Sequence, residues 1–124
     1  MRRRRGFTLI ELLVVMAIIA TLLAVSVPRY FRSVDHAREA ALRQDLAVMR
    51  DAIDKHHADT GRYPGALDEL VAKRYLRRIP VDPITESADS WVVAPPADRE
   101  SGAVYDVASG APGNGRDGTP FSSW

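Results

Sequence analysis

The longest apolar segment of the chain covers residues 7–27, and Glu11 is its only charged residue. An apolar stretch of about 20 residues is long enough to cross the hydrocarbon core of a bilayer as a helix. An ionisable side chain inside such a segment is costly and indicates a function by default. The pattern therefore predicts a transmembrane helix over residues 7–27 in which Glu11 has a specific task.

A second hydrophobic pattern follows Pro28, a residue that normally ends or kinks a helix. Apolar residues recur there at spacings of four, three and four, which indicates an amphipathic helix. Gly61 is the expected C-terminal stop. We predict one long helix from about residue 7 to about residue 59, kinked or loosened near Pro28. Its apolar stripe consists of Leu42, Leu46, Met49 and Ile53.

Charged and polar residues occupy the other faces of this helix. Glu39 with Arg43, and Asp51 with Lys55, lie four apart in the acid-first order, so both pairs are predicted to support an exposed helix surface. His56 and His57 point about 100° apart and cannot easily share a tetrahedral metal ion. We interpret both histidines as solvated residues at the helix end.

The remaining sequence alternates short apolar runs with prolines and glycines. Residues 66–75 have helical spacing and predict a short second helix, whereas residues 90–94 and 103–108 predict an antiparallel hairpin. A glycine-rich tail follows, with Phe121 and Trp124 as anchors. A two-stranded hairpin is barely stable alone, so the amphipathic half of the long helix should cover it. The predicted fold class is α+β.

Charge and composition exclude several function classes. The formal net charge is +1, and taking away the four arginines at residues 2–5 leaves −3, which gives no basic face for nucleic acid. The chain has no cysteine, so it has neither a disulfide framework nor a thiolate site. No Ser/His/Asp set or paired carboxylates indicate catalysis, and we predict that the protein is not an enzyme.

Two ordinary interpretations compete for the N-terminal segment. A secretory signal peptide would explain the basic start and the small residues Ala24 and Ser26, but its apolar region usually spans about 7 to 15 residues. A plain single-pass anchor would keep the arginine block in the cytoplasm by the positive-inside rule. That interpretation leaves Glu11 unexplained.

A third interpretation accounts for Glu11. The run Arg5-Gly6-Phe7-Thr8-Leu9-Ile10-Glu11 resembles the processing site of type IV prepilins and type II secretion pseudopilins. The resemblance implies that a membrane-embedded peptidase cuts between Gly6 and Phe7 and methylates Phe7. The new amine and Glu11 carry complementary charges, and an unpaired buried charge would be costly. Pairing of Glu11 with the amine of the next subunit would therefore favour one register in a fibre.

Motifs in the second half are similar to the G-type major pseudopilin branch of type II secretion. They are Tyr63-Pro64, residues 67–76, Pro80-Val81-Asp82-Pro83 and residues 105–110. The resemblance implies a type IV pilin fold and a homo-oligomeric helical fibre in the periplasm that drives protein export. The implied partners are the prepilin peptidase/methyltransferase, minor pseudopilins and the inner-membrane platform of the secretion system.

This interpretation divides the chain into a cleaved leader at 1–6, a transmembrane and polymerisation helix at 7–27, and a head at 28–124. The N-terminus would be cytoplasmic and the head periplasmic, with the protein in the bacterial inner membrane before assembly. Two alternatives stay open: a type IV pilus subunit, and a bitopic membrane protein that binds a partner without polymerising.

Heads of this branch commonly bind calcium in the loop after the last strand. Calcium requires six to eight oxygen ligands, usually with several carboxylates. This chain has Gly110-Ala111-Pro112-Gly113 where the family tends to have Gly-Ala-Asp-Gly, and only Asp117 remains as an acid in the tail. Asp117 is thus the candidate calcium ligand, with Asp106 upstream. The alternative is that Asp117-Gly118 forms a simple turn.

Overall fold

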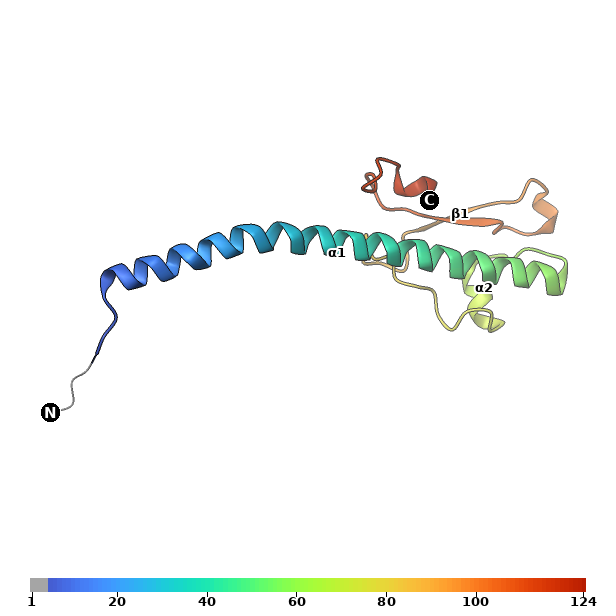
Figure 1. The fold of residues 1–124 in the computed structure, drawn as a ribbon. Helices are drawn as coiled ribbons and strands as arrows, with labels where there is room; N and C mark the ends of the chain where they lie inside the picture. Colours follow the sequence, from blue (N-terminus) through green and yellow to red (C-terminus); the bar gives the residue numbers. More distant parts are fainter. Residues whose placement is uncertain (1–4) are drawn as a thin grey trace. The chain divides into compact units, whose positions relative to one another are not determined.

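The computed structural model describes residues 5–124, so residues 1–4 of the predicted leader lie outside it. The chain divides into two compact units, Met1–Asp35 and His36–Trp124. The elements follow one another in the order seen in Figure 1. They are α1 (Leu9–Thr60), α2 (Leu67–Ala72), β1 (Trp91–Ala94), η1 (Arg99–Ser101), β2 (Asp106–Ser109) and η2 (Phe121–Ser123).

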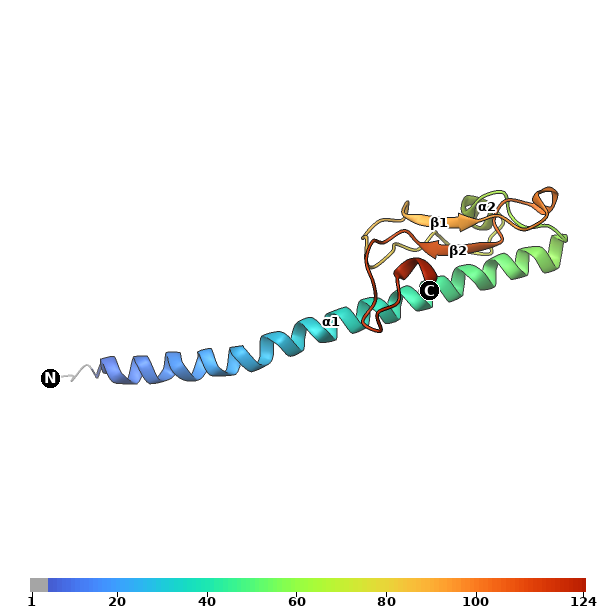
Figure 2. The ribbon, with the colours of Figure 1, turned by 90° about the horizontal axis from the view of Figure 1, so that it is seen from above.

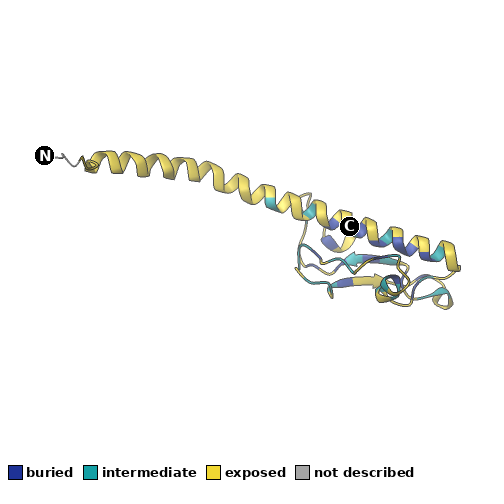
Figure 3. Ribbon diagram, turned by 90° about the horizontal axis from the view of Figure 1, so that it is seen from below, coloured by how far each residue is buried: buried dark blue, intermediate teal, exposed yellow. Residues whose placement is uncertain are grey.

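The first unit contains the N-terminal part of α1. It includes an 18-residue window of mean hydropathy 2.7, long and apolar enough to cross a membrane, and none of that window is buried within the chain. Figure 3 shows this stretch as exposed throughout. The helix assignment runs through Pro28 without a break, and the kink predicted there stays a prediction.

The second unit is built around the predicted apolar stripe of α1. Figure 3 shows the buried positions of this part of the helix on the side that faces the strands. Leu46 is only 1% exposed, and its stripe neighbours are equally buried. The stripe prediction is therefore confirmed. The stripe packs into one hydrophobic cluster with Leu70, Leu76, Trp91, Val104, Val107, Ala111 and Phe121.

The sheet consists of β1 and β2, which pair antiparallel with Trp91 opposite Ser109 and Ala94 opposite Asp106. Figures 1 and 2 show both strands alongside the C-terminal part of α1. The second strand begins at Asp106 rather than at the predicted residue 103. Residue 104 is not in the ladder because its amide donates to the carbonyl of Pro64 at 2.9 Å instead. The α+β pilin fold is as predicted.

Both helices end in left-handed backbone. The φ angle of Gly61 is 72°, and its amide donates to the carbonyl of His57 at 2.8 Å, which confirms the predicted stop. The second helix ends at Ala72, earlier than the predicted residue 75, because Arg74 has φ 64° and turns the chain. Because residue 74 is not a glycine, no signal in the sequence predicts a turn at this position.

We expect Leu46→Ala to lower the free energy of unfolding of the head by about 2–5 kcal/mol, because it removes buried methyl groups and leaves a cavity. The matched control is Val48→Ala on the same helix, whose side chain is 41% exposed. The control should cost under about 1 kcal/mol. Chemical denaturation of the detergent-solubilised protein measures both. Equal losses in the two variants would contradict the assignment of the stripe as the core.

Candidate functional site

The predicted processing site lies just before α1. Residues 5–8 have no helical assignment, and the side chain of Phe7 is 90% exposed. A Cβ added to Gly6 would meet no atom within 4 Å. Exposed irregular backbone of this kind is where proteases gain access to a chain. The Gly6–Phe7 bond is thus accessible to an enzyme.

Glu11 lies in the first turn of α1 and forms a reciprocal pair with Thr8. The Thr8 amide donates to Oε2 of Glu11 at 3.1 Å, and the Glu11 amide donates to Oγ1 of Thr8 at 3.2 Å. This is a capping box, which satisfies two amides that the helix itself leaves unpaired. The capping box was not among the predicted features, although Thr-x-x-Glu before an apolar run is its signature.

Apolar side chains lie beside Glu11 at the start of α1. A surface hollow at this point is lined by Phe7, Ile10, Glu11, Val14 and Val15. A carboxylate is favoured near the positive end of a helix. It is costly in an apolar environment unless a second charge pairs with it. The site therefore offers one anionic group in an otherwise apolar surface, one helical turn from Phe7.

The head motifs that resemble the G-type branch are joined by a buried hydrogen bond. Asp82 and Ser109 are both 0% exposed, and the Ser109 hydroxyl donates to Oδ2 of Asp82. Oδ1 of Asp82 accepts from the Ile84 amide at 2.8 Å, and Oγ of Ser109 accepts from the Ala111 amide at 3.1 Å. The two motifs lie 27 residues apart in the sequence. The structure shows that they form one polar cluster inside the core.

The prediction that both histidines are solvated is wrong for His56. Its side chain is 2% exposed, and its ring makes an edge contact with Tyr75 at 5.4 Å between centroids. Nδ1 lies 2.8 Å from the carbonyl oxygen of Arg62, which can only accept, so Nδ1 carries the proton. The physical reason is the turn at Gly61, which folds the chain back over the helix end. His57 stacks on Tyr63.

Of the two predicted ion pairs on α1, Asp51 with Lys55 is confirmed at 2.7 Å, whereas Glu39 with Arg43 is wrong. The amide of Arg116 donates to Oε1 of Glu39 at 2.7 Å, whereas Arg43 pairs with Asp117 at 3.3 Å. Both side chains on α1 thus contact the tail, which lies 74 to 77 residues later in the chain. A local spacing rule could not reveal partners so distant in sequence.

The carboxylate of Asp117 already binds groups of the protein itself, although its side chain is 49% exposed. Oδ1 accepts from the hydroxyl of Thr119 at 2.6 Å and from its amide at 3.0 Å. The Thr119 hydroxyl, its amide and then the charge of Arg43 lower the pKa of Asp117 below its usual value. Within residues 5–124, no three His, Cys, Asp or Glu side chains come together as metal ligands. The residues present do not fit a calcium site.

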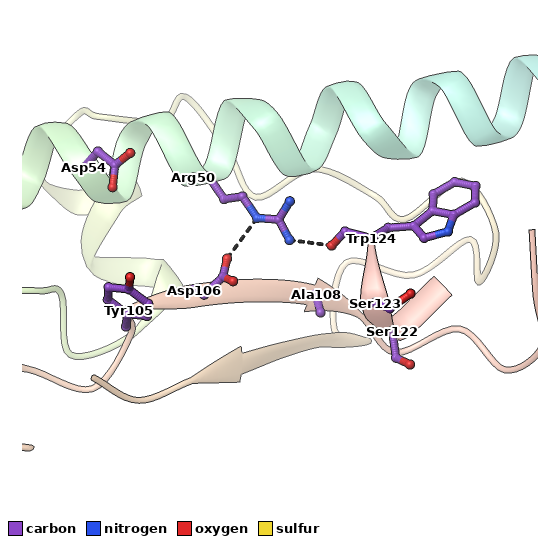
Figure 4. A pocket seen from close by; sticks show the side chains of 8 residues that line it. All are labelled: Arg50, Asp54, Tyr105, Asp106, Ala108, Ser122, Ser123 and Trp124. Carbon is purple, nitrogen blue, oxygen red and sulfur yellow. Dashed lines mark hydrogen bonds and ion pairs between the residues drawn. The ribbon is translucent and has the colours of Figure 1, made fainter. Parts of the chain in front are cut away.

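Asp106 is held in the same way by Arg50, which sequence reasoning did not single out. Figure 4 shows Arg50 reaching from α1 to Asp106 on β2 and to the main-chain oxygen of Trp124. Nε donates to Oδ1 of Asp106 at 2.8 Å, and a terminal nitrogen donates to the oxygen of Trp124 at 2.5 Å. These groups line a groove of about 530 Å³. Through its ion pair with Asp106 and its hydrogen bond to Trp124, Arg50 joins the helix, the sheet and the tail.

The fold and the N-terminal segment together define a prepilin-type protein with an α+β pilin fold. Residues 1–27 match the family described as the prokaryotic N-terminal methylation motif.

Several relatives of the chain share one name. "Type II secretion system core protein G" of Klebsiella pneumoniae is 32% identical over 99 residues, covering 67% of this chain and 71% of that protein. The protein of the same name from Klebsiella michiganensis is 31% identical over 138 residues, covering 97% and 90%. No solved structure matches the chain significantly. The chain belongs to the family of type II secretion system core protein G, a family of structural pseudopilins and not of enzymes.

We expect Asp82→Ala to lower the free energy of unfolding by about 2–4 kcal/mol, because it leaves the Ser109 hydroxyl and buried amides without a hydrogen-bond acceptor. The control is Asp89→Ala, since Asp89 is exposed and close by in the sequence. That variant should change stability by under about 0.5 kcal/mol. Urea denaturation checks both values, and a neutral Asp82→Ala would show that the cluster does not stabilise the head.

Proposed function

We propose that this protein is a structural subunit of a type II secretion pseudopilus. The single observation that carries the proposal is the arrangement at the start of α1. An accessible Gly6–Phe7 bond precedes a capped, apolar helix whose first turn presents the carboxylate of Glu11. Family membership supplies the secretion system as the setting.

The proposed maturation removes residues 1–6. The prepilin peptidase/methyltransferase hydrolyses the Gly6–Phe7 peptide bond with one water, which leaves a carboxylate on Gly6 and an amine on Phe7. The enzyme then transfers a methyl group from a methyl-donor cosubstrate to that amine, which gives up a proton. Before this step the arginine block keeps the N-terminus in the cytoplasm by the positive-inside rule. Residues 7–27 hold the subunit in the inner membrane, and residues 28–124 form the periplasmic head. After the step, the N-terminus carries one positive charge in place of the basic leader.

The proposed assembly pairs Glu11 with the Phe7 amine of a neighbouring subunit. The capping box engages Oε2 of Glu11, and no hydrogen bond to Oε1 occurs within the part of the chain that the structure describes. One carboxylate oxygen can therefore cap its own helix while the other accepts from a neighbouring amine. In an apolar helix bundle, leaving either charge unpaired is costly, so the pair fixes the axial register of the fibre.

The assembled fibre would drive protein export, in contact with minor pseudopilins and the inner-membrane platform. The chain supplies the subunit, and an ATPase elsewhere in the system would supply the energy.

Mass spectrometry of the mature protein tests the maturation step. We expect Phe7 at the N-terminus with one added methyl group. Gly6→Val should leave the precursor uncut, because a larger side chain would meet the peptidase and not this chain. Arg5→Lys, which keeps the charge, should be processed normally. Any other mature N-terminus in the wild-type protein would refute the proposed maturation.

Glu11→Gln separates the charge of Glu11 from its capping hydrogen bond, because glutamine also serves in a capping box. We expect fibre yield and secretion to fall at least about tenfold, since a buried amine would lose its counter-charge. Glu11→Asp keeps the charge but shortens the side chain, and it should retain more assembly than Glu11→Gln. Electron microscopy and a secretion assay provide the readouts. Normal fibres from Glu11→Gln would refute the proposed charge pairing, whereas a wild-type protein that forms no fibres would favour a membrane protein that does not polymerise.

A further inference from the structure

The tail of the head is closed by a ring of four side chains. Thr119 donates its hydroxyl to Asp117 at 2.6 Å and accepts from Nε1 of Trp124 at 2.7 Å. Arg43 of α1 completes the ring, because its guanidinium pairs with Asp117 and lies 4.1 Å from the centroid of the Trp124 ring. Every hydrogen bond in this ring joins one donor to one acceptor. The arrangement needs no additional ion to balance it.

The main chain of the loop fits closely around this ring. The Gly115 amide donates to the carbonyl of Thr119 at 2.8 Å, and the Gly118 amide donates to that of Gly115 at 3.0 Å. A Cβ on Gly115 would collide with the ring of Trp124. Gly118 has φ 82°, which favours glycine. These contacts define one conformation of residues 115–119.

The face of α1 that meets the tail carries three polar residues in register. Glu39, Arg43 and Arg50 lie four and seven residues apart, so they project from one side of the helix. Glu39 accepts a hydrogen bond from the Arg116 amide, Arg50 pairs with Asp106 at the start of β2, and Arg43 pairs with Asp117 in the tail. Both acids considered as calcium ligands are thus neutralised from the same helix.

We propose that Arg43 holds the tail in the place where relatives with this fold would use calcium, so that the folded head does not depend on calcium. The fixed positive charge of Arg43 supplies the counter-charge for Asp117, and its planar group stacks on Trp124, which a metal ion does not do. A calcium ion beside Asp117 would also meet the repulsion of Arg43. The ion pair alone is about half exposed, so screening weakens it and the stack contributes substantially.

Thermal unfolding of the full chain in detergent micelles tests this proposal. The wild-type protein should have the same Tm in excess EDTA and in millimolar calcium, because a ligand that binds only the folded state would raise the Tm. Arg43→Gln should lower the Tm by roughly 4–8 °C. The matched control is Arg38→Gln, since Arg38 makes only an exposed pair with Glu86 at 3.9 Å. That control should shift the Tm by less than roughly 2 °C.

Hydrogen exchange gives a local readout for the same variants. In Arg43→Gln, the amides of Gly115, Arg116 and Thr119 should lose protection while the β1–β2 ladder keeps its own. EDTA should not change these rates in the wild-type protein. Calcium that raises the wild-type Tm, or EDTA that lowers it, overturns the proposal. It is overturned equally if Arg43→Gln behaves like Arg38→Gln. Because the readouts follow the head, they are independent of fibre assembly.

Discussion

The structure depends on one constraint: a polar group placed in apolar surroundings must have a partner. Asp82 meets it through the hydroxyl of Ser109, and Glu11 meets it in part, through the amide of Thr8. An unpartnered polar group would cost several times what a typical hydrogen bond contributes. The positions of the partners therefore fix where these segments of the chain lie. In the head, this constraint links motifs that are separated by more than twenty residues.

The C-terminal part of α1 satisfies two demands at once. One face carries the apolar stripe that builds the core, and the adjacent face carries Glu39, Arg43 and Arg50. A two-stranded sheet cannot form a stable domain alone, so the stripe supplies its missing cover. The polar face then fixes the glycine-rich tail, which has little apolar surface to bury. The helix thus organises both the regular and the irregular parts of the head.

Features with a short-range signal could be predicted from the sequence. The apolar spacing of Leu42 and Leu46 identified the core face, and Gly61 identified the end of α1. The motif around Gly6 and Glu11 was enough by itself to indicate the prepilin family, which the match over residues 1–27 supports. Each of these signals is local, because periodicity, helix stops and processing motifs act within a few residues.

Features that depend on long-range contacts could not be predicted in this way. The i,i+4 rule assigned Arg43 to Glu39, but both side chains have partners in the tail. His56 was expected at the surface, yet the turn at Gly61 buries it. The early end of α2 at Arg74 is a third case, since a non-glycine residue adopts the left-handed conformation there. In each case the tertiary structure overrides the local preference.

Whether a bound metal ion or an arginine supplies the positive charge at the tail affects how the stability of the head responds to solution conditions. A bound metal ion stabilises a fold by an amount that rises with the concentration of the free ion. An arginine on the same chain is present in every molecule, so its contribution is independent of the divalent ions in the compartment. Its contribution falls with ionic strength instead, because the pair of Arg43 and Asp117 is partly exposed. In the proposed arrangement, an arginine in place of an ion would therefore replace dependence on one ligand with a weak dependence on total salt.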